Sequence, residues 1–328
     1  MADSAQGEMG RLIVAAPRGF CAGVDRAIDI VDLALEAFPP PLYVRREIVH
    51  NKAVVDGFRE RGVIFVESLD EVPSGSWVIF SAHGVSPAVW EKARARDLQV
   101  IDATCPLVTK VHLEVRRFTS KGYDIVLIGH DGHDEVIGTM GEAPDRIHLV
   151  GTPEEVEHLQ IPDPERVAYT TQTTLSVDET RQIIEALRRR FPSIKGPRKD
   201  DICYATQNRQ DAVKSLLKEG IELLIVVGSD NSSNSVRLCE AAEAQGVEAH
   251  LIDSPEEVET AWLDGLRTVG LTAGASAPEF LVEGVADLIR GLGYVTEEHV
   301  VVQEDVRFSL PPGLSETARA RGTALPTS

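Results

Sequence analysis

Three cysteines of the chain are each followed by polar residues at similar distances. The cysteines are Cys21, Cys105 and Cys203. The first polar layer comes 29, 28 and 29 residues later and consists of His50, His133 and Ser232. The second comes 62, 68 and 73 residues after the cysteines and consists of His83, Thr173 and Ser276. Thiolates bind soft metals, whereas histidines and hydroxyl groups bind anions and carry protons. The matched order predicts three similar units that contribute to one site.

The three units share a further sequence motif, in which a residue with a hydroxyl group shortly precedes two acidic residues. The hydroxyl residues are Ser68, Thr152 and Ser254. Such a side chain can accept a hydrogen bond from the first turn of a helix, and the acids face the positive end of the helix dipole. Three predicted helix starts in phase with three cysteines support the internal repeat.

The cysteine spacing favours an iron–sulfur cluster over other metal sites. The sequence holds no two cysteines separated by two residues, which argues against a zinc ribbon, a thioredoxin motif and a bacterial ferredoxin. Cysteines from three units can bind three irons of a cubane cluster, so the fourth iron would stay open to a substrate oxygen. The alternative is that the three thiols are only core residues. Cys239 has no counterpart in the other units, and we expect it to be a packing thiol.

Short apolar runs alternate with amphipathic segments along the chain, which predicts an α/β protein with parallel sheets. The predicted strands are 11–16, 42–49, 63–66, 77–81, 100–101, 124–128, 147–150, 167–170, 222–227, 249–252 and 268–272. Ligands of such sheets bind beyond the carboxyl ends of the strands. The cysteines and both polar layers fall near those ends, so we expect all nine residues to converge on one central cavity.

Two polar loops that lead into helices predict a site for an anion. They are 231–235 (Asn-Ser-Ser-Asn-Ser) and 273–278 (Ala-Gly-Ala-Ser-Ala-Pro). Backbone N–H groups, small hydroxyls and the helix dipole favour phosphate at such loops, although a single loop can be an ordinary helix cap. His50 and His83 can add donors of charge-assisted hydrogen bonds, so we predict a diphosphate site.

The stretch 129–135 places His133 and Glu135 at the mouth of the second predicted sheet. A carboxyl group in a closed, partly apolar site has a raised pKa and can donate a proton near neutral pH. We prefer Glu135 over Asp131 and Asp134 as the acid. It follows His133 by two residues, so an extended turn would point both side chains to the same side.

The composition limits the class of protein. The 328 residues, 43% of them hydrophobic, suit two or three globular domains. Residues 1–10 lack the build of a signal peptide and no apolar run is long enough for a membrane span, so we expect a cytoplasmic protein. The net charge of −19 argues against nucleic acid as a partner. Basic residues gather in 188–199, which we interpret as a solvated helix end and linker. A docking patch for an acidic redox partner is the alternative.

Nine stretches of the sequence resemble the LytB family. They are PRGFCAGVDRAI (17–28), REIVHN (46–51), FSAHGVS (80–86), DATCPLVTKVH (102–112), IGHDGHDEVIGTMGE (128–142), TQTTLSVDET (171–180), GPRKDDICYATQNRQ (196–210), GSDNSSNS (228–235) and TAGASAP (272–278). The resemblance covers residues 11–311. It implies a trefoil of three α/β domains, related by pseudo-threefold symmetry, whose small and mainly parallel sheets surround a [4Fe-4S] cluster. The implied cluster ligands are Cys21, Cys105 and Cys203.

The resemblance also implies the remaining site residues. Contacts to the substrate would come from His50, His83, His133, Thr173, Ser232, Ser233, Asn234 and Ser276. The implied catalytic residues are Glu135, His133 and Thr173. The corresponding domains would be 11–102 with a C-terminal return at 297–314, then 103–200, then 201–296. We predict that the tail 315–328 is disordered.

The function implied by the resemblance is a reductive dehydroxylation. An oxidoreductase of this kind converts 4-hydroxy-3-methylbut-2-enyl diphosphate to isopentenyl and dimethylallyl diphosphate, the last step of the non-mevalonate isoprenoid pathway. The sequence has no G-x-G-x-x-G nucleotide motif, so reduced ferredoxin or flavodoxin would supply the electrons. We expect a monomer with neither a nucleic-acid nor a membrane partner.

Two alternatives use the same three cysteines. A quinolinate-synthase-like enzyme would use an open cluster for condensation and dehydration, and it would need no external reductant. A cluster-based sensor would need a surface for nucleic acid or a partner, which the acidic charge disfavours.

Overall fold

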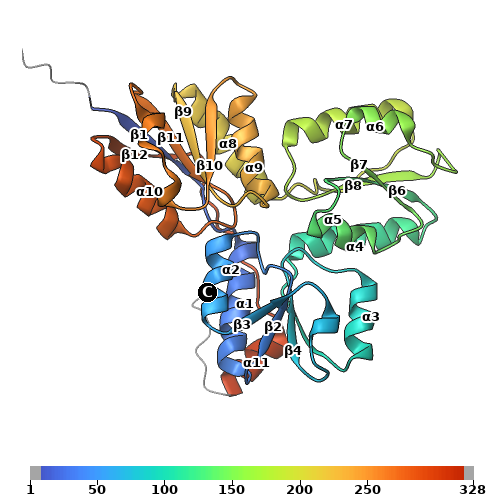
Figure 1. Ribbon diagram of the computed structural model, residues 1–328. Coiled ribbons are helices and arrows are strands. Elements are labelled where there is room, and N and C mark those ends of the chain that lie inside the picture. The colour runs from blue at the N-terminus through green and yellow to red at the C-terminus, as the bar shows by residue number, and fades with distance from the viewer. Residues whose placement is uncertain (1–8, 321–328) are drawn as a thin grey trace, which may run out of the picture. The chain divides into compact units, whose positions relative to one another are not determined.

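Residues 9–320 are described by the computed structural model, and they form helices and three parallel sheets (Figure 1). The ends, 1–8 and 321–328, lie outside the described residues. They include most of the N-terminus that was judged to lack a signal peptide and the last part of the predicted tail. Contacts divide the chain into two compact units. Unit 1 comprises Met1–Cys21 with Tyr204–Asp305, and unit 2 comprises Ala22–Cys203 with Val306–Ser328.

Unit 2 contains a four-stranded parallel sheet in the order β3-β2-β4-β5. Its strands are β2 (Leu42–Arg45), β3 (Val63–Val66), β4 (Trp77–Phe80) and β5 (Gln99–Asp102). The helices that precede or connect them are α1 (Ala22–Ala37), α2 (Lys52–Glu60), η1 (Leu69–Glu71) and α3 (Pro87–Ala95). Val78, Ile79 and Phe80 of β4 are all fully buried. Because successive side chains point to opposite faces, this central strand has protein on both faces.

The second sheet of unit 2 has three parallel strands in the order β7-β6-β8. The strands are β6 (Asp124–Ile128), β7 (Ile147–Val150) and β8 (Val167–Thr171). The helices of this part are α4 (Pro106–Thr119), α5 (Asp134–Met140), α6 (Pro153–His158) and α7 (Val177–Arg190). Every residue of β8 is buried, including its two threonines, so the polar end of this strand faces into the protein.

Unit 1 contains a five-stranded parallel sheet in the order β10-β9-β11-β1-β12. The strands are β1 (Arg11–Ala16), β9 (Leu223–Val227), β10 (Glu248–Ile252), β11 (Thr268–Ala273) and β12 (Val295–Val300). The helical elements are α8 (Tyr204–Lys218), α9 (Ser233–Glu243), η2 (Pro255–Glu257), η3 (Thr260–Leu263) and α10 (Glu279–Gly291). Apolar residues of α8 and α9 share one core with β1 and β9.

The internal repeat is visible in the order of the strands. In each sheet, three strands that follow one another in the sequence have the spatial order second, first, third, as in β7-β6-β8. A helical turn joins the second strand to the third in each case, and these turns are η1, α6 and η2. The predicted α/β class with three parallel sheets is therefore confirmed. The predicted side-chain caps are confirmed for Ser68 and Thr152, whereas Ser254 makes no side-chain cap.

The first and last strands of unit 1 differ from the sequence prediction. We grouped 11–16 with the first domain, but β1 pairs with β11 on one side and β12 on the other. β12 itself was not predicted because it alternates little and is mostly exposed. β1 is apolar, and its Leu12 and Ala15 are fully buried. Its backbone N–H and C=O groups therefore need hydrogen-bond partners at both edges of the strand, and β12 provides those at the second edge.

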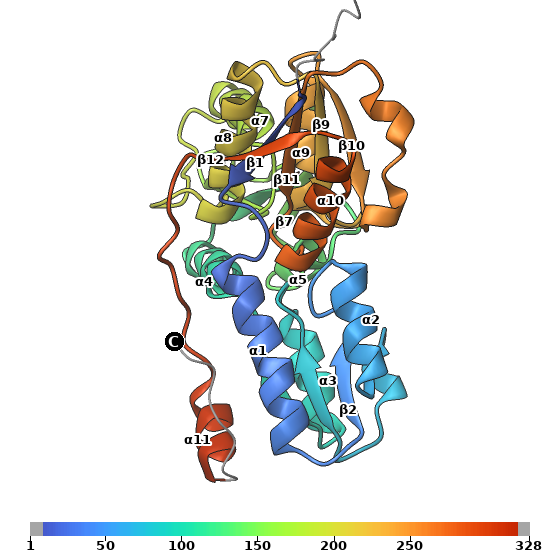
Figure 2. The ribbon, with the colours of Figure 1, turned by 90° about the vertical axis from the view of Figure 1, so that its left-hand side faces the viewer.

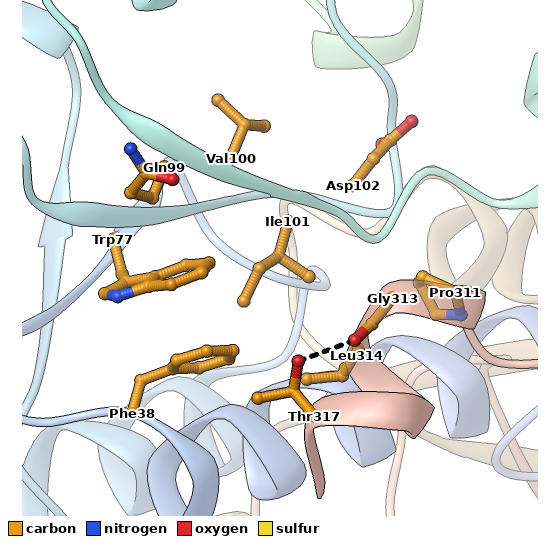
Figure 3. Close-up of a pocket in the computed structure, with 10 residues that line it drawn as sticks. All are labelled: Phe38, Trp77, Gln99, Val100, Ile101, Asp102, Pro311, Gly313, Leu314 and Thr317. Carbon is orange, nitrogen blue, oxygen red and sulfur yellow. Dashed lines mark hydrogen bonds between the residues drawn. The ribbon is translucent and has the colours of Figure 1, made fainter. Parts of the chain in front are cut away.

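The predicted disordered tail is wrong for its first residues. Pro312–Ala320 forms α11, which packs against α1 of the same unit (Figure 2). Leu314 and Ala318 are one helical turn apart and both buried, so they attach the helix. Beside α11 lies a cavity of about 310 Å³ whose lining includes the stacked rings of Phe38 and Trp77 (Figure 3). Within residues 9–320, no helix combines the length and the apolar character needed to cross a membrane.

Candidate active site

Three histidines of unit 2 form a compact aromatic cluster. His50 follows β2 and His83 follows β4, and because these strands are parallel neighbours their carboxyl ends lie at the same edge. The two rings are stacked, with centroids 3.9 Å apart. His133, which follows β6, stands edge-on to both rings at centroid distances of 5.4 and 6.0 Å. The structure thus brings together three residues that the sequence places far apart.

An ion pair borders the histidine cluster. Arg46, in the left-handed region with φ 57, contacts Asp134 through its guanidinium group, and Asp134 lies 3.9 Å from Nδ1 of His83. Burial, reinforced by His50, His133 and Arg46, lowers the pKa of His83 well below its ordinary value. Burial therefore disfavours the charged form of the His83 ring, but a neutral imidazole N–H can still donate to an anionic phosphate oxygen, so the charge-assisted donor at His83 stays a prediction. Arg46 adds a positive charge near the cluster.

This group of side chains has the spacing of a metal site as well as of an anion site. One nitrogen each from His50 and His83 and one oxygen from Asp134 lie within 4.8 Å of one another. A cation here would meet the guanidinium group of Arg46, which already neutralises Asp134. Imidazole N–H groups beside an arginine suit phosphate oxygens better.

His133 caps the start of α5. Its Nδ1 accepts a hydrogen bond from the backbone N–H of Glu135 at 3.1 Å. Burial, together with His50 and His130, lowers the pKa of His133 to about 3. The ring is therefore neutral at physiological pH and carries its proton on Nε2. The predicted extended turn is wrong, because the helix begins at Asp134 and capping brings His133 and Glu135 together.

Glu135 is the second residue of α5, and only 2% of its surface is exposed. Its Oε1 accepts a hydrogen bond from the backbone N–H of Thr173 at 2.7 Å, and its Oε2 accepts one from the Thr173 hydroxyl at 2.9 Å. Burial raises the pKa of Glu135 to about 7, although both Thr173 bonds lower it; Asp201 makes a smaller raising contribution. At neutral pH the carboxyl group is therefore partly protonated and can act as an acid.

The two predicted cluster cysteines of unit 2 are attached to the loops of this polar group. The backbone N–H of Cys105 donates to the carbonyl of Ala82, the residue before His83, at 2.9 Å. The backbone N–H of Cys203 donates to the carbonyl of Thr173 at 3.0 Å. These bonds place each cysteine next to a predicted substrate-binding residue.

A buried carboxylate fixes the segment that leads to Cys203. Asp201 accepts hydrogen bonds from the hydroxyl of Thr170 at 2.7 Å and from the backbone N–H of Thr171 at 3.1 Å. Nζ of Lys110 on α4 forms an ion pair with it at 3.1 Å. Asp201 thus joins the Cys203 segment to β8 and α4, a role that the run of charged residues in the sequence did not reveal.

Unit 1 carries the second group of predicted site residues. Ser232 caps α9, and its Oγ lies 3.4 Å from Oγ of Ser276 and 3.0 Å from Oγ of Ser235. Asn234 is buried, and its Oδ1 accepts a hydrogen bond from the backbone N–H of Ala275 at 2.7 Å. The two predicted anion-binding loops are therefore joined to each other at the start of α9, next to Ser233.

Two glycines allow the loops of unit 1 to close around Ser235. A Cβ atom at Gly274 would lie 1.9 Å from Oγ of Ser235, and one at Gly228 would lie 2.2 Å from the same atom. Because neither distance is possible for real atoms, only glycine lets both loop backbones approach Ser235.

The four cysteines, all within the described residues, differ in a way that suits metal binding by three of them. No disulfide links them, and the side chains of Cys21, Cys105 and Cys203 are partly exposed. Each directly precedes a helix, whose positive end favours a thiolate. Cys239 instead is buried in the core of unit 1, where burial raises its pKa to about 12. The prediction that Cys239 is a packing thiol is confirmed.

The sequence of the chain is similar to those of known reductases. The family described as LytB protein matches residues 12–290. The chain belongs to the LytB family. The 4-hydroxy-3-methylbut-2-enyl diphosphate reductase of Acidothermus cellulolyticus is 56% identical over 320 residues, which are 97% of this chain and 94% of the relative. The reductase of the same name from Aeromonas hydrophila is 58% identical over 307 residues, which are 92% of this chain and 98% of the relative.

A solved structure of a LytB relative has the same fold. The E-1-hydroxy-2-methyl-but-2-enyl-4-diphosphate reductase from Plasmodium falciparum superposes with a TM-score of 0.92 at 38% identity, covering 96% of this chain and 100% of that one. These relatives are named as reductases, so the quinolinate-synthase-like alternative finds no support.

The LytB-family chain thus shows two polar groups, one in each unit. The group of unit 2 contains His50, His83, His133, Glu135 and Thr173. The group of unit 1 contains Ser232, Ser233, Asn234 and Ser276. That both groups serve one cavity stays a prediction. Sequence reasoning missed Arg46 and its ion pair with Asp134, which was considered only as an alternative acid, although both residues lie in stretches that resemble the family.

Proposed function

We propose that the chain is an iron–sulfur reductase that converts 4-hydroxy-3-methylbut-2-enyl diphosphate to isopentenyl and dimethylallyl diphosphate. The observation that carries this proposal is the buried Glu135–Thr173 pair, a carboxyl group with a pKa of about 7 beside a hydroxyl relay. A reductive dehydroxylation consumes two electrons and two protons and releases the substrate oxygen as water, so it needs an acid of this kind. The names of the relatives support the same reaction.

The cofactor in this proposal is a [4Fe-4S] cluster, with one iron ligand from each of three cysteines. The ligands are Cys21, Cys105 and Cys203. When bound, the cluster would supply electrons and a Lewis-acidic iron without a cysteine ligand. Three partly exposed thiols at helix starts fit this role by their chemistry, and the buried Cys239 does not.

The diphosphate would be bound by both polar groups. In unit 2, Nε2–H of neutral His133 can donate to a phosphate oxygen, while Arg46 offsets the negative charge of Asp134. In unit 1, the donors would be the hydroxyls of Ser232, Ser233 and Ser276, the amide of Asn234 and the first N–H groups of α9. These donors do not have to take up protons in order to bind the diphosphate.

The proton would travel from Glu135 through the hydroxyl of Thr173. That hydroxyl donates to Glu135 in the present arrangement, so it must reverse its bond when it passes the proton on. His133 contributes by holding the first turn of α5, through its bond to the Glu135 N–H. The acid is thereby fixed at both its backbone and its carboxyl group before the substrate arrives.

The electrons would come from a separate protein. We propose reduced ferredoxin or flavodoxin as the donor to a monomeric, cytoplasmic enzyme.

The test is an anaerobic assay of the reconstituted protein. With 4-hydroxy-3-methylbut-2-enyl diphosphate and a chemical reductant, we expect isopentenyl and dimethylallyl diphosphate, and no product without the reductant. The Cys105→Ser variant is the matched control for cluster-dependent turnover. Failure to form either product in a protein that carries a full cluster would reject the proposed reaction.

A further inference from the structure

Arg209 of α8 is an unexpected residue for the interior of unit 1. It is 0% exposed and has the greatest residue volume among the fully buried side chains of the described residues. A buried guanidinium group is stable only when its donors are bonded and its charge is balanced. Its partners therefore indicate what the residue does.

Two of the four partner residues belong to the loop before Cys21. Nε and Nη2 of Arg209 donate to the carbonyl of Gly19 at 3.2 and 2.7 Å, and Nη2 also donates to the carbonyl of Phe20 at 3.3 Å. Nη1 donates to the carbonyl of Ala205 at 3.0 Å and to the carboxylate of Glu304 at 3.1 Å. The five N–H groups of the side chain thus all have acceptors.

The same loop has further contacts within unit 1. Gly19 has φ +66, and a Cβ atom there would lie 3.1 Å from the carbonyl oxygen of Ala277. The backbone N–H of Cys21 donates to the carbonyl of Ala275 at 3.1 Å. Ala275 in turn donates its N–H to Asn234, so the Cys21 loop is joined to the predicted diphosphate loop.

A second residue of α8 completes this connection. Nδ2 of Asn234 donates to the hydroxyl of Thr206 at 3.2 Å, one helical turn before Arg209. α8 therefore fixes both the Cys21 loop and the loop of Asn234. A lysine could replace the charge of Arg209, but its single nitrogen lacks the fork that holds two successive carbonyls.

We propose that Arg209 is a positioning residue that fixes the direction in which the Cys21 loop presents its thiol to the iron–sulfur cluster. The inference rests on the proposed role of Cys21 as an iron ligand. It goes beyond that role because it names the residue that holds the loop and a chain of contacts from the loop to Asn234.

The experiment measures the exposure of Cys21 in the metal-free, full-length chain. Iodoacetamide labelling would be followed at the peptide level, with Cys105 as the internal reference. The variant is Arg209→Lys, and the matched control is Leu216→Ala, which opens a cavity in the core beside the same helix without touching the loop. The EPR spectrum of the reduced, reconstituted protein gives a second measurement.

For Arg209→Lys we expect Cys21 to be labelled about tenfold faster, the factor that corresponds to one lost hydrogen bond of a charged donor. We also expect a changed EPR spectrum. Leu216→Ala should lower the melting temperature and leave both the labelling rate and the spectrum unchanged. Equal labelling rates in Arg209→Lys and wild type, or the same increase in Leu216→Ala, would overturn the proposal.

A second variant covers the case in which Arg209→Lys does not fold. Arg209→Met combined with Glu304→Gln removes both charges together, and Asn208, which donates to Glu304 at 2.9 Å, remains to bond the new amide. We expect faster labelling of Cys21 in this pair and a wild-type rate in Glu304→Gln alone. A wild-type rate in the pair would also reject the proposal. Full cluster retention in Cys21→Ser would instead reject the ligand assignment and leave the loop contacts as they are.

Discussion

Replacing Glu135 by Gln should remove the proton donor and leave the site intact. The new amide can keep both contacts, because its oxygen can accept from the Thr173 N–H and its nitrogen can donate to the Thr173 hydroxyl. Losing a general acid typically costs 10²-fold or more, so we expect kcat to fall by roughly 10². KM and iron content should stay close to wild type. The assay is anaerobic turnover with a chemical reductant.

The pH dependence provides an independent check of the same residue. The acid must be protonated, so wild-type kcat should fall as pH rises through about 7, the pKa of Glu135. In Glu135→Gln the remaining kcat should lack this fall with rising pH, the falling limb of the pH profile. Asp131→Asn, an exposed change in the same loop, is the control and should retain it. Near-normal turnover in Glu135→Gln, or an unchanged falling limb, would refute the assignment.

The raised pKa of Glu135 also predicts an effect on stability. The folded state binds this proton more tightly than the unfolded chain, whose carboxyl titrates near 4.5. The wild-type protein should therefore lose stability as pH rises from about 4.5 through about 7, by at most about 3 kcal/mol. Glu135→Gln lacks this loss. Thermal unfolding of the metal-free chain should show the variant gaining stability relative to wild type between pH 5 and pH 8, and an equal difference at both pH values would contradict the burial argument.

Three further predictions concern the other site residues. Serine at Cys21, Cys105 or Cys203 should remove most of the iron and the activity, as measured by iron analysis and turnover. Cys239→Ser should keep both, because Cys239 is a core thiol. Inorganic diphosphate should compete with substrate, and His50→Ala should raise KM more than it alters the cluster spectrum. Unchanged KM in single variants of His50, His83, Ser232, Asn234 and Ser276 would remove the diphosphate assignment. Thr173→Val removes a bond that lowers the pKa of Glu135, so the fall of kcat with rising pH should move to higher pH, and a fall at an unchanged pH would contradict this effect of the bond. A kcat of normal size below that pH would exclude the relay.

The sequence predicted the repeat and the class of fold because these depend on short-range patterns. Short apolar strands that alternate with amphipathic helices are local features, and the three parallel sheets confirm them. β12 was not predicted because this edge strand depends on pairing with β1, which lies far away in the sequence. α11 was not predicted because only its contact with α1, through residues such as Leu314, distinguishes it from a polar tail.

The sequence supplied candidate site residues by type, but not the contacts between them. Glu135 was selected for its sequence neighbour His133, but the reason was an extended turn that the structure replaces with a helix start. The ion pair of Arg46 with Asp134 and the fully buried Arg209 depend on contacts between distant segments. No local sequence pattern predicts such contacts, since a charged residue in a loop or helix is usually solvated.

The central claim is that three cysteines hold a cluster with one iron left for the substrate. Mössbauer spectra of anaerobically reconstituted protein containing ⁵⁷Fe, recorded with and without 4-hydroxy-3-methylbut-2-enyl diphosphate, test it most directly. We predict that one iron site has parameters distinct from the others and that the substrate shifts this site alone. A spectrum in which all irons are equivalent, or one that the substrate leaves unchanged, would contradict the account.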